Sequence, residues 1–334
     1  MRIVQVLASI GVGGLEKHVR ELSAALAENG HAVFVIAAPE FLQTLPASVQ
    51  GIAVNMRLNR YHPWLLWQVF CALKRTRADI IHAQANKAVS LIAWLKPWLR
   101  VACVGTMHNM KRQVRAYQAM DQVICVSRAL AKTLQDVAHT QVIYNGIRSA
   151  KTLTPIVNLT VKQKPMLCAV GRLVAAKGFD ILLEAVDGLS LHLVIAGDGP
   201  QKSQLLARIA KLHPDTQVTL TGHHQDVIGL MKQSDGLVIS SRKEGFSYVL
   251  NEALLNGVCV ISTDVPIANE VLPATLIAPI GDAKALRHLI RQYLAHPHQW
   301  QQDMQSVFVW ARTQLTLSRM VNETSAMYAQ LRAK

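Results

Sequence analysis

Residues 244–252 have the sequence Glu244-Gly-Phe-Ser-Tyr-Val-Leu-Asn-Glu252 and lie just after the apolar segment Gly236–Ser240. The apolar segment predicts a buried strand, and Glu252–Gly257 continues as a helix. Open α/β sheets bind ligands at the carboxyl ends of their strands, which is where Glu244 lies. Glycine and serine at a helix start leave backbone N–H groups free for an anion, and carboxylates accept hydrogen bonds from hydroxyl groups. The segment therefore predicts a ligand site in an α/β domain, although a capping serine beside two solvated glutamates has the same spacing.

The residues on both sides of this segment repeat the order of strand, then helix. Strands are predicted at Met166–Val170, Leu191–Ala196, Val218–Leu220, Gly236–Ser240 and Val258–Ser262. Helical spacing occupies the residues between them, at Phe179–Val186, Gln201–Leu212 and Val227–Gln233. Short buried strands separated by helices indicate a parallel sheet covered on both faces.

The first half of the chain has the same organisation, so we expect a second domain of the same kind there. Its predicted strands are Ile3–Ala8, Ala32–Ala37, Ile80-Ile81, Val101–Gly105 and Gln122–Val126, and a helix is predicted over Leu15–Asn29. The polar segment 146–165, with Pro155 and Pro165, predicts the boundary. A chain of 334 residues agrees with two domains at about 150 residues each. A final helix is predicted over 310–331.

The positive charge of the chain is concentrated in its first half. The net charge is +14, and residues 1–150 hold 17 Lys and Arg against 7 Asp and Glu, a net of +10. This imbalance indicates an anionic partner such as a phosphorylated glycan, an acidic lipid surface or a nucleic acid, although charge that serves only solubility is an alternative. No helix-turn-helix, zinc-finger or aromatic RNA-binding pattern accompanies the charge, so we expect no nucleic-acid partner.

Cysteine usage and the N-terminal residues both favour a cytoplasmic protein. The five cysteines include no CxxC pair, and most lie in apolar runs, which is typical of buried reduced thiols. Residues 1–7, Met-Arg-Ile-Val-Gln-Val-Leu, predict a strand rather than a signal peptide. No stretch approaches the run of about 18 apolar residues that a membrane span needs.

Two further loops follow predicted strands. Gly171-Arg-Leu-Val-Ala-Ala-Lys-Gly178 places Arg172 and Lys177 beside one strand end, which suits a diphosphate, although exposed basic residues are common near helix starts. Gly11-Val-Gly-Gly-Leu-Glu16 departs from the GxGxxG pattern because position 16 is glutamate. That departure disfavours a nicotinamide-dependent enzyme, while the glycines still permit close approach of a ligand to the backbone.

Together these segments resemble retaining glycosyltransferases of the GT-B fold, specifically glycosyltransferase family 4. Each motif alone is loose, but their order and spacing are specific, and they cover most of the chain. The motifs are Gly13-Gly-Leu-Glu-Lys-His-Val19, Ile81-His82, Thr106-Met-His108, Val142-Ile-Tyr-Asn-Gly-Ile147, Gly171-Arg-Leu with Lys177-Gly178, Ile195-Ala-Gly-Asp-Gly-Pro200, Leu220-Thr-Gly222, and Glu244 with Glu252.

The resemblance implies an α/β fold with two Rossmann-like, doubly wound domains that face a central cleft. Residues 1–148 and a C-terminal helix at 314–334 would form the acceptor-side domain, and residues 155–313 would bind the donor. One departure from the family pattern is Arg148, where many relatives carry Asp. A second is the short segment 107–121, which in relatives helps to shape the acceptor site.

The resemblance also implies roles for individual residues. Glu244 would contact the hydroxyls of the donor sugar, and Glu252 would hold the nucleotide ribose. Arg172 and Lys177 would neutralise the leaving nucleoside diphosphate. His108 would lie near the transferred sugar and is grouped with the catalytic residues, although a buried structural histidine is an alternative. Other donor contacts would come from Gly13, Gly14, Gly222, Gly245, Phe246, Ser247 and Tyr248.

The expected reaction retains the anomeric configuration and uses no metal or other cofactor, because Arg172 and Lys177 would supply the charge that a divalent cation supplies elsewhere. Glu244 matches a sugar-binding residue of the family rather than a covalent nucleophile. A nucleoside-diphosphate sugar, by default a uridine one, is the expected donor. A sugar-nucleotide epimerase of the same fold and a non-catalytic binding protein are the alternatives.

Aromatic and basic residues in the first half bear on the acceptor. Residues 61–77 and 91–100 combine Trp and Tyr with Lys and Arg, a composition typical of membrane interfaces, although core helices would also contain these apolar residues. Lys111, Arg112 and Arg115 could meet acceptor phosphates or headgroups, or form a solvated helix face. We expect a lipid-linked or phosphorylated glycan acceptor, as in bacterial lipopolysaccharide synthesis, and a peripheral position at the cytoplasmic face of the inner membrane.

Overall fold

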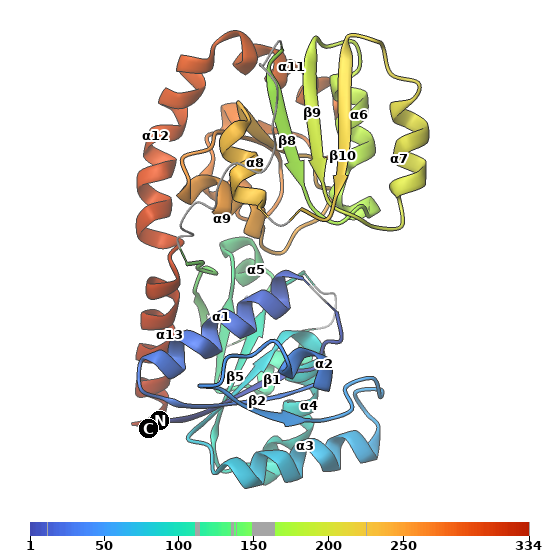
Figure 1. Cartoon of the computed structure of the whole chain (residues 1–334). Coiled ribbons are helices and arrows are strands. Elements are labelled where there is room, and N and C mark those ends of the chain that lie inside the picture. Colours follow the sequence, from blue (N-terminus) through green and yellow to red (C-terminus); the bar gives the residue numbers. More distant parts are fainter. Residues whose placement is uncertain are drawn as a thin grey trace. The chain divides into compact units, whose positions relative to one another are not determined.

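The computed structural model describes residues 1–11, 13–110, 114–134, 137, 139–148, 164–224 and 226–333. They form two compact units (Figure 1). Unit 1 consists of Met1–Arg148 and Gln314–Lys334, and unit 2 of Ser149–Thr313. Most of the predicted boundary, 146–165, lies outside the described residues.

Unit 1 is built on a parallel sheet with the strand order β3-β2-β1-β4-β5-β6-β7. The strands are β1 (Arg2–Leu7), β2 (Ala32–Ala37), β3 (Gln50–Ala53), β4 (Ile80–Gln84), β5 (Ala102–Met107), β6 (Gln122–Cys125) and β7 (Thr140–Val142). The helices are α1 (Gly14–Glu28), α2 (Pro39–Leu42), α3 (Pro63–Thr76), α4 (Ala85–Leu95), α5 (Arg128–Lys132) and α13 (Leu317–Arg332), with the short 3₁₀ helices η1 (Lys96–Trp98) and η2 (Arg115–Ala119).

The two faces of this sheet are covered by different helices. Side chains alternate between faces along a strand, so Ile3 and Leu7 of β1 point toward the layer of α1 and α13, where they join the main core of the unit. Figure 1 shows α1 on one face of the sheet and α3 on the other. The structure thus confirms a parallel sheet covered on both faces.

The C-terminal helix α13 belongs to the core of unit 1. Its buried side chains include Met320, Val321 and Tyr328, and α13 packs beside α1. The single helix predicted over 310–331 is wrong, because α12 (Pro297–Gln314) ends before α13 begins. At the break, Thr316 caps α13 by accepting a hydrogen bond from the N–H of Arg319, and the backbone of Ile147 pairs with residues 315 and 317.

Unit 2 is a second parallel sheet, with the order β10-β9-β8-β11-β12-β13. The strands are β8 (Met166–Val170), β9 (Leu191–Ala196), β10 (Thr216–Gly222), β11 (Gly236–Ile239), β12 (Val260–Thr263) and β13 (Ile277–Ala278). The helices are α6 (Phe179–Val186), α7 (Lys202–Ile209), α8 (Val227–Gln233), α9 (Tyr248–Leu255), α10 (Ala268–Val271), α11 (Ala283–Ala295) and α12, with the 3₁₀ helices η3 (Ala175–Lys177) and η4 (Ala274–Leu276).

Both sheets are doubly wound, as predicted. In unit 2 the chain moves from β8 outward through β9 to β10 and then returns to β11 on the other side of β8. In unit 1 the corresponding reversal lies between β1 and β4. Loops that leave such neighbouring strands in opposite directions open a crevice at the carboxyl ends of the strands, where ligands bind in folds of this class.

No helix in the described residues combines the length and the apolar character that crossing a bilayer requires.

Candidate active site

In unit 2, the loops after β8 and β11 are joined by an ion pair at the strand reversal. The Nζ atom of Lys177 donates to Oε1 of Glu244 at 2.5 Å, and the hydroxyl of Ser241 donates to the same oxygen at 2.7 Å. The Glu244 side chain is 9% exposed and that of Lys177 is 22% exposed. The structure thus brings together two predicted site residues that are 67 positions apart.

Backbone contacts fix these two loops against each other. The N–H of Arg242 donates to the carbonyl of Ala176 at 2.8 Å, and the Ser240 hydroxyl donates to the carbonyl of Lys177 at 3.0 Å. Gly178 has a φ of +63°, and a Cβ there would lie 2.1 Å from the carbonyl oxygen of Ser240. Only glycine permits both this conformation and this approach.

Arg242 adds a second ion pair, which the sequence analysis did not identify. Its guanidinium forms two hydrogen bonds with the Asp180 carboxylate, at 2.7 and 2.8 Å, and a third with the carbonyl of Ala175. The hydrogen bonds from Arg242 lower the pKa of Asp180. This pair holds the loop that carries Glu244 against the start of α6. No local pattern signals it, because the partners are 62 residues apart.

Three glycines allow the loops that follow β8, β9 and β10 to lie close together at the carboxyl ends of these strands. A Cβ on Gly197, after β9, would lie 1.9 Å from the carbonyl oxygen of Gly171, after β8. The N–H of Gly197 also donates to the carbonyl of Gly222, at the end of β10. Gly222 is therefore linked to the β8 loop through Gly197.

The remaining predicted donor residues surround the start of α9. Ser247 caps this helix by accepting a hydrogen bond from the N–H of Leu250, and α9 places Glu252 about one turn after its start, as predicted. Gly245 is buried, while Glu252 is half-buried in the second turn of the helix. The rings of Phe246 and Tyr248 lie edge to face, with centroids 5.7 Å apart. Arg172 is exposed beyond β8 and pairs with no carboxylate in the described residues.

In unit 1, Gly13 and Gly14 form the start of α1, next to the end of β1. Glu16, in the first turn, is 8% exposed, and its carboxylate accepts a hydrogen bond from the Ser9 hydroxyl. Val12 lies outside the described residues. The role of the two glycines in donor binding stays a prediction.

His108 belongs to a buried polar cluster at the strand reversal of unit 1. Its Nε2 atom lies 2.8 Å from Oε1 of Gln84, and the Gln84 amide donates to the side chain of Gln5. Gln5 donates in turn to the hydroxyl of Tyr328, which lies 2.5 Å from Nδ1 of His82. The other ring nitrogen of His82 is hydrogen-bonded to Thr106 at 2.5 Å.

Burial keeps the histidines of this cluster neutral. It lowers the pKa of His18 to about 4 and that of His82 to about 3. Burial is the main cause that holds the pKa of His108 well below 6.5. The rings of His18 and His108 meet edge to face at 4.7 Å. A neutral imidazole can donate or accept a hydrogen bond. Because His108 is buried, this arrangement also fits the alternative of a structural histidine, and its catalytic role stays a prediction.

Of the predicted acceptor residues, Lys111 and Arg112 lie outside the described residues, and Arg115 is exposed at the start of η2. The tryptophans of the two aromatic segments lie on the surface, with Trp64, Trp67, Trp94 and Trp98 between 53% and 62% exposed. Their helices contact the core through aliphatic side chains instead, for example Leu65, Val69 and Leu73 of α3. The core-helix alternative therefore holds for the two helices, while their tryptophans lie on the exposed sides.

Possible metal ligands and thiols are dispersed. In the described parts of both units, no group of three or more His, Cys, Asp or Glu side chains is arranged to hold a metal ion. All five cysteines are free, and burial raises the pKa of Cys168 to about 12.

Two family models match the chain, in consecutive segments. Residues 12–151 match "Glycosyltransferase Family 4", and residues 152–306 match "Glycosyl transferases group 1". A lipopolysaccharide core biosynthesis glycosyltransferase, LpsE of Rhizobium meliloti, is 25% identical over 304 residues, covering 85% of this chain and 86% of that protein.

Solved structures show the same fold. A glycosyltransferase from Rickettsia africae superposes with a TM-score of 0.82 at 19% identity, covering 98% of each chain. HepE of Anabaena, solved in complex with UDP-glucose, also has a TM-score of 0.82 at 19% identity, covering 98% of this chain and 99% of that one.

Proposed function

Since the chain belongs to glycosyltransferase family 4 and has the GT-B fold, we propose that it transfers a sugar from a nucleoside-diphosphate sugar to a lipid-linked or phosphorylated glycan. The donor is a uridine-linked hexose or N-acetylhexosamine, and the product belongs to lipopolysaccharide or another cell-envelope glycan. The similarity to a lipopolysaccharide core transferase over most of both chains supports this choice.

The observation that carries the proposal is the Lys177–Glu244 pair at the strand reversal of unit 2. It places a cation and a carboxylate side by side at a strand end, beside the N-terminus of α9. A sugar diphosphate presents the complementary groups, an anionic diphosphate next to hydroxyls. Lys177 and the exposed Arg172 would stabilise the charge that develops on the leaving diphosphate. Glu244 would accept hydrogen bonds from the sugar hydroxyls.

The loop that carries Glu244 leads into α9 and would supply further contacts to the donor. Backbone N–H groups at Phe246, Ser247 and Tyr248 face the start of α9, where a helix stabilises anions. Glu252 would hold the ribose hydroxyls, and Gly222 would leave space for the nucleotide. Gly13, Gly14 and His108 remain predicted donor contacts.

The reaction we propose retains the anomeric configuration without a covalent intermediate. The acceptor oxygen attacks the anomeric carbon on the face from which the diphosphate departs. The bond between that carbon and the phosphate oxygen breaks, and a phosphate oxygen takes the proton of the acceptor hydroxyl. Because Arg172 and Lys177 already supply positive charge, the proposal requires no metal ion.

We further propose that unit 1 contacts an anionic membrane surface at the cytoplasmic face. On α3, Trp64 and Trp67 stack with ring centroids 4.7 Å apart, and both are more than half exposed. Lys74 and Arg75 extend the same exposed side of the helix. Tryptophan at headgroup depth beside basic residues is typical of interfacial helices.

The five cysteines support the cytoplasmic side of the membrane in this proposal. All five are free thiols, which is typical of proteins in a reducing compartment.

The proposal is tested by a thermal-shift screen of nucleoside diphosphates and sugar nucleotides, followed by an assay of diphosphate release. A ligand that binds the folded state raises its melting temperature, and release should depend on an added glycolipid acceptor. Release without acceptor would indicate an epimerase instead, and no shift with any nucleotide would contradict a donor site. The membrane contact predicts salt-sensitive binding to anionic vesicles; full activity on a small neutral sugar without such binding would exclude it.

A further inference from the structure

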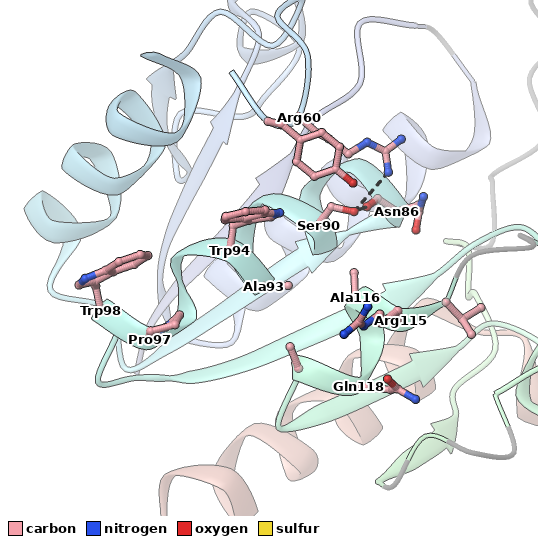
Figure 2. A pocket seen from close by; sticks show the side chains of 13 residues that line it. Arg60, Asn86, Ser90, Ala93, Trp94, Pro97, Trp98, Arg115, Ala116 and Gln118 are labelled. Carbon is pink, nitrogen blue, oxygen red and sulfur yellow. Dashed lines mark hydrogen bonds between the residues drawn. The ribbon is translucent and has the colours of Figure 1, made fainter. Parts of the chain in front are cut away.

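Unit 1 contains a groove whose lining includes none of the predicted donor-site residues. Its volume is about 1220 Å³, and it runs along α4 and η1 on one wall, with η2 on the other. Figure 2 shows Arg60 and Asn86 at one end of the groove and Pro97 and Trp98 at the other. Arg115 and Ala116 lie on the wall opposite α4 (Figure 2).

The groove follows from the sequence of α4. Residues Asn86, Ser90, Ala93 and Trp94 recur at helical spacing, so they share one side of the helix. The opposite side carries the core residues Ala88, Ile92 and Leu95. Small side chains, at Ser90 and Ala93 on this wall and at Ala116 and Ala119 on the other, leave the space between the walls open.

One end of the groove is positively charged. The Nη1 atom of Arg60 donates to the Ser90 hydroxyl at 3.3 Å, which holds the half-buried guanidinium over the groove. Neither Arg60 nor Arg115 pairs with a carboxylate in the described residues. Burial and the nearby Arg60 charge lower the pKa of Lys87, whose Nζ atom donates to the carbonyl of Met56. This end of the groove therefore carries positive charge, and no carboxylate lines it among the described residues.

The other end is apolar and aromatic. Trp94 is 57% exposed and Trp98 is 62% exposed. The ring of Tyr61 meets that of Trp94 edge to face, with centroids 6.0 Å apart. Ala93 and Pro97 complete this end. Exposed aromatic side chains that lie together in a groove are suited to hold an apolar ligand.

We propose that this groove binds the lipid portion of the acceptor, with its phosphate between Arg60 and Arg115 and its hydrocarbon along Trp94 and Trp98. This binding site rests on the proposed function, because it assumes that the acceptor is linked to a lipid. About 12 Å along the helix axis separates Asn86 from Trp94, at 1.5 Å per residue. The charged and apolar ends are thus far enough apart for a phosphate and the first part of a chain.

The lining favours an anionic amphiphile over a neutral glycan. Sugar sites use carboxylates and amides to accept hydrogen bonds from hydroxyls. The described residues around this groove include no carboxylate, and Asn86 and Gln118 are its amides. Two arginines without a carboxylate partner in the described part of the chain instead suit phosphate oxygens, which arginine binds with two parallel hydrogen bonds.

The test uses the whole chain, without donor, and dodecyl phosphate below its micellar concentration. Of the six tryptophans, Trp94 and Trp98 should show shifted indole N–H signals in a nitrogen-15 NMR spectrum, assigned by Trp→Phe variants. The affinity should fall at least tenfold in Arg60→Ala and in Arg115→Ala. It should be unchanged in Arg57→Ala, an exposed arginine outside the groove that pairs with Glu40. Thermal melts establish that each variant is folded.

Three results would overturn the proposal. Equal affinity for dodecyl maltoside would remove the role of the phosphate, and equal affinity for inorganic phosphate would remove that of the chain. Shifts at Trp64 and Trp67 without shifts at Trp94 and Trp98 would place the lipid on α3 instead. A thermal shift with UDP in the same preparation separates the two hypotheses: if it persists while dodecyl phosphate fails to bind, only the groove assignment is lost.

Discussion

The Nζ atom of Lys177 lies 2.5 Å from Oε1 of Glu244, so the residue proposed for the diphosphate and the residue proposed for the sugar hold each other in the absence of substrate. The pair keeps both side chains in place at a strand end. It also means that a diphosphate must share Lys177 with a carboxylate of the same sign. The two partners should therefore respond to substitution in different ways.

Replacing Lys177 by alanine should weaken nucleoside diphosphate binding at least tenfold. A hydrogen bond to a charged group contributes about 1.5–3 kcal/mol, and about 1.4 kcal/mol corresponds to tenfold in affinity. Isothermal titration with UDP measures the change. Lys243→Ala is the control, since Lys243 is exposed on the neighbouring loop; an equal loss in both variants would contradict a specific role for Lys177.

Glu244→Gln should separate binding from turnover. The amide keeps the shape and removes the negative charge beside Lys177, so UDP affinity should stay within about threefold or increase. The transfer rate should fall by about 100-fold or more, because contacts to the reacting sugar strengthen in the transition state. Titration and an initial-rate assay on the same preparation would show this. A parallel loss of UDP affinity would indicate that Glu244 supports the fold of the loop rather than the sugar.

Asp180→Asn should lower the free energy of unfolding by about 1 kcal/mol, the range of partly exposed ion pairs. The pKa of Asp180 is lowered in the folded state by Arg242, so its stabilisation is present above the pKa of the unfolded chain and is lost as pH falls through the folded value. Urea denaturation should accordingly show a wild-type advantage at pH 7 that shrinks in acid. Asp215→Asn, at an exposed position, should show no such difference.

Because of the buried histidines, we expect the free energy of unfolding to begin to fall at a higher pH than the titration of Asp180 would cause. His18 and His82 have folded pKa values of about 4 and about 3, below the usual value of about 6.5. The unfolded chain therefore takes up protons first, and stability is full above pH 6.5 and falls as pH drops toward 4. Melting temperatures from pH 8 to pH 4 measure this. His82→Gln should flatten the profile, whereas His298→Gln, at an exposed position, should leave it unchanged.

Tyr328→Phe should destabilise unit 1 by about 1–3 kcal/mol, because it leaves buried partners without a hydrogen bond. The lost partners are His82 and Gln5. Urea denaturation measures the cost, and Tyr61→Phe is the control, because Tyr61 is 57% exposed. A neutral result would show that His82 finds another partner.

Most strands were predictable because each contains a short aliphatic run that ends at a polar or glycine-rich loop. The strands β3, β7 and β13 are only two to four residues long and were not predicted. Three predicted strands, Ala32–Ala37, Met166–Val170 and Leu191–Ala196, have the same bounds in the structure. The order of strands was not predictable from local patterns. Pairing of β11 with β8 joins residues about 70 positions apart, and this pairing brings the Lys177 and Glu244 loops together.

Errors in the sequence analysis have identifiable physical causes. The helical pattern continues through residues 315 and 316, but the carbonyl of Leu315 and the N–H of Leu317 hydrogen-bond with the backbone of Ile147, and the helix breaks there. The exposure of the α3 tryptophans could have been predicted from the spacing of the aliphatic residues in the helix. Leu65, Val69 and Leu73 already form a complete aliphatic side, which leaves Trp64 and Trp67 on the opposite one.

The place of α13 in the core of unit 1 has a consequence for biosynthesis. Residues 317–328 are translated after the whole of unit 2, yet Met320, Val321 and Tyr328 pack against β1 and α1. Unit 2 is continuous in sequence, so it can fold before synthesis of the chain reaches α13. Until then, the apolar side chains of unit 1 that α13 covers stay exposed to solvent. Chaperone contact and aggregation during synthesis should concentrate on residues 1–148 until the last helix emerges from the exit tunnel.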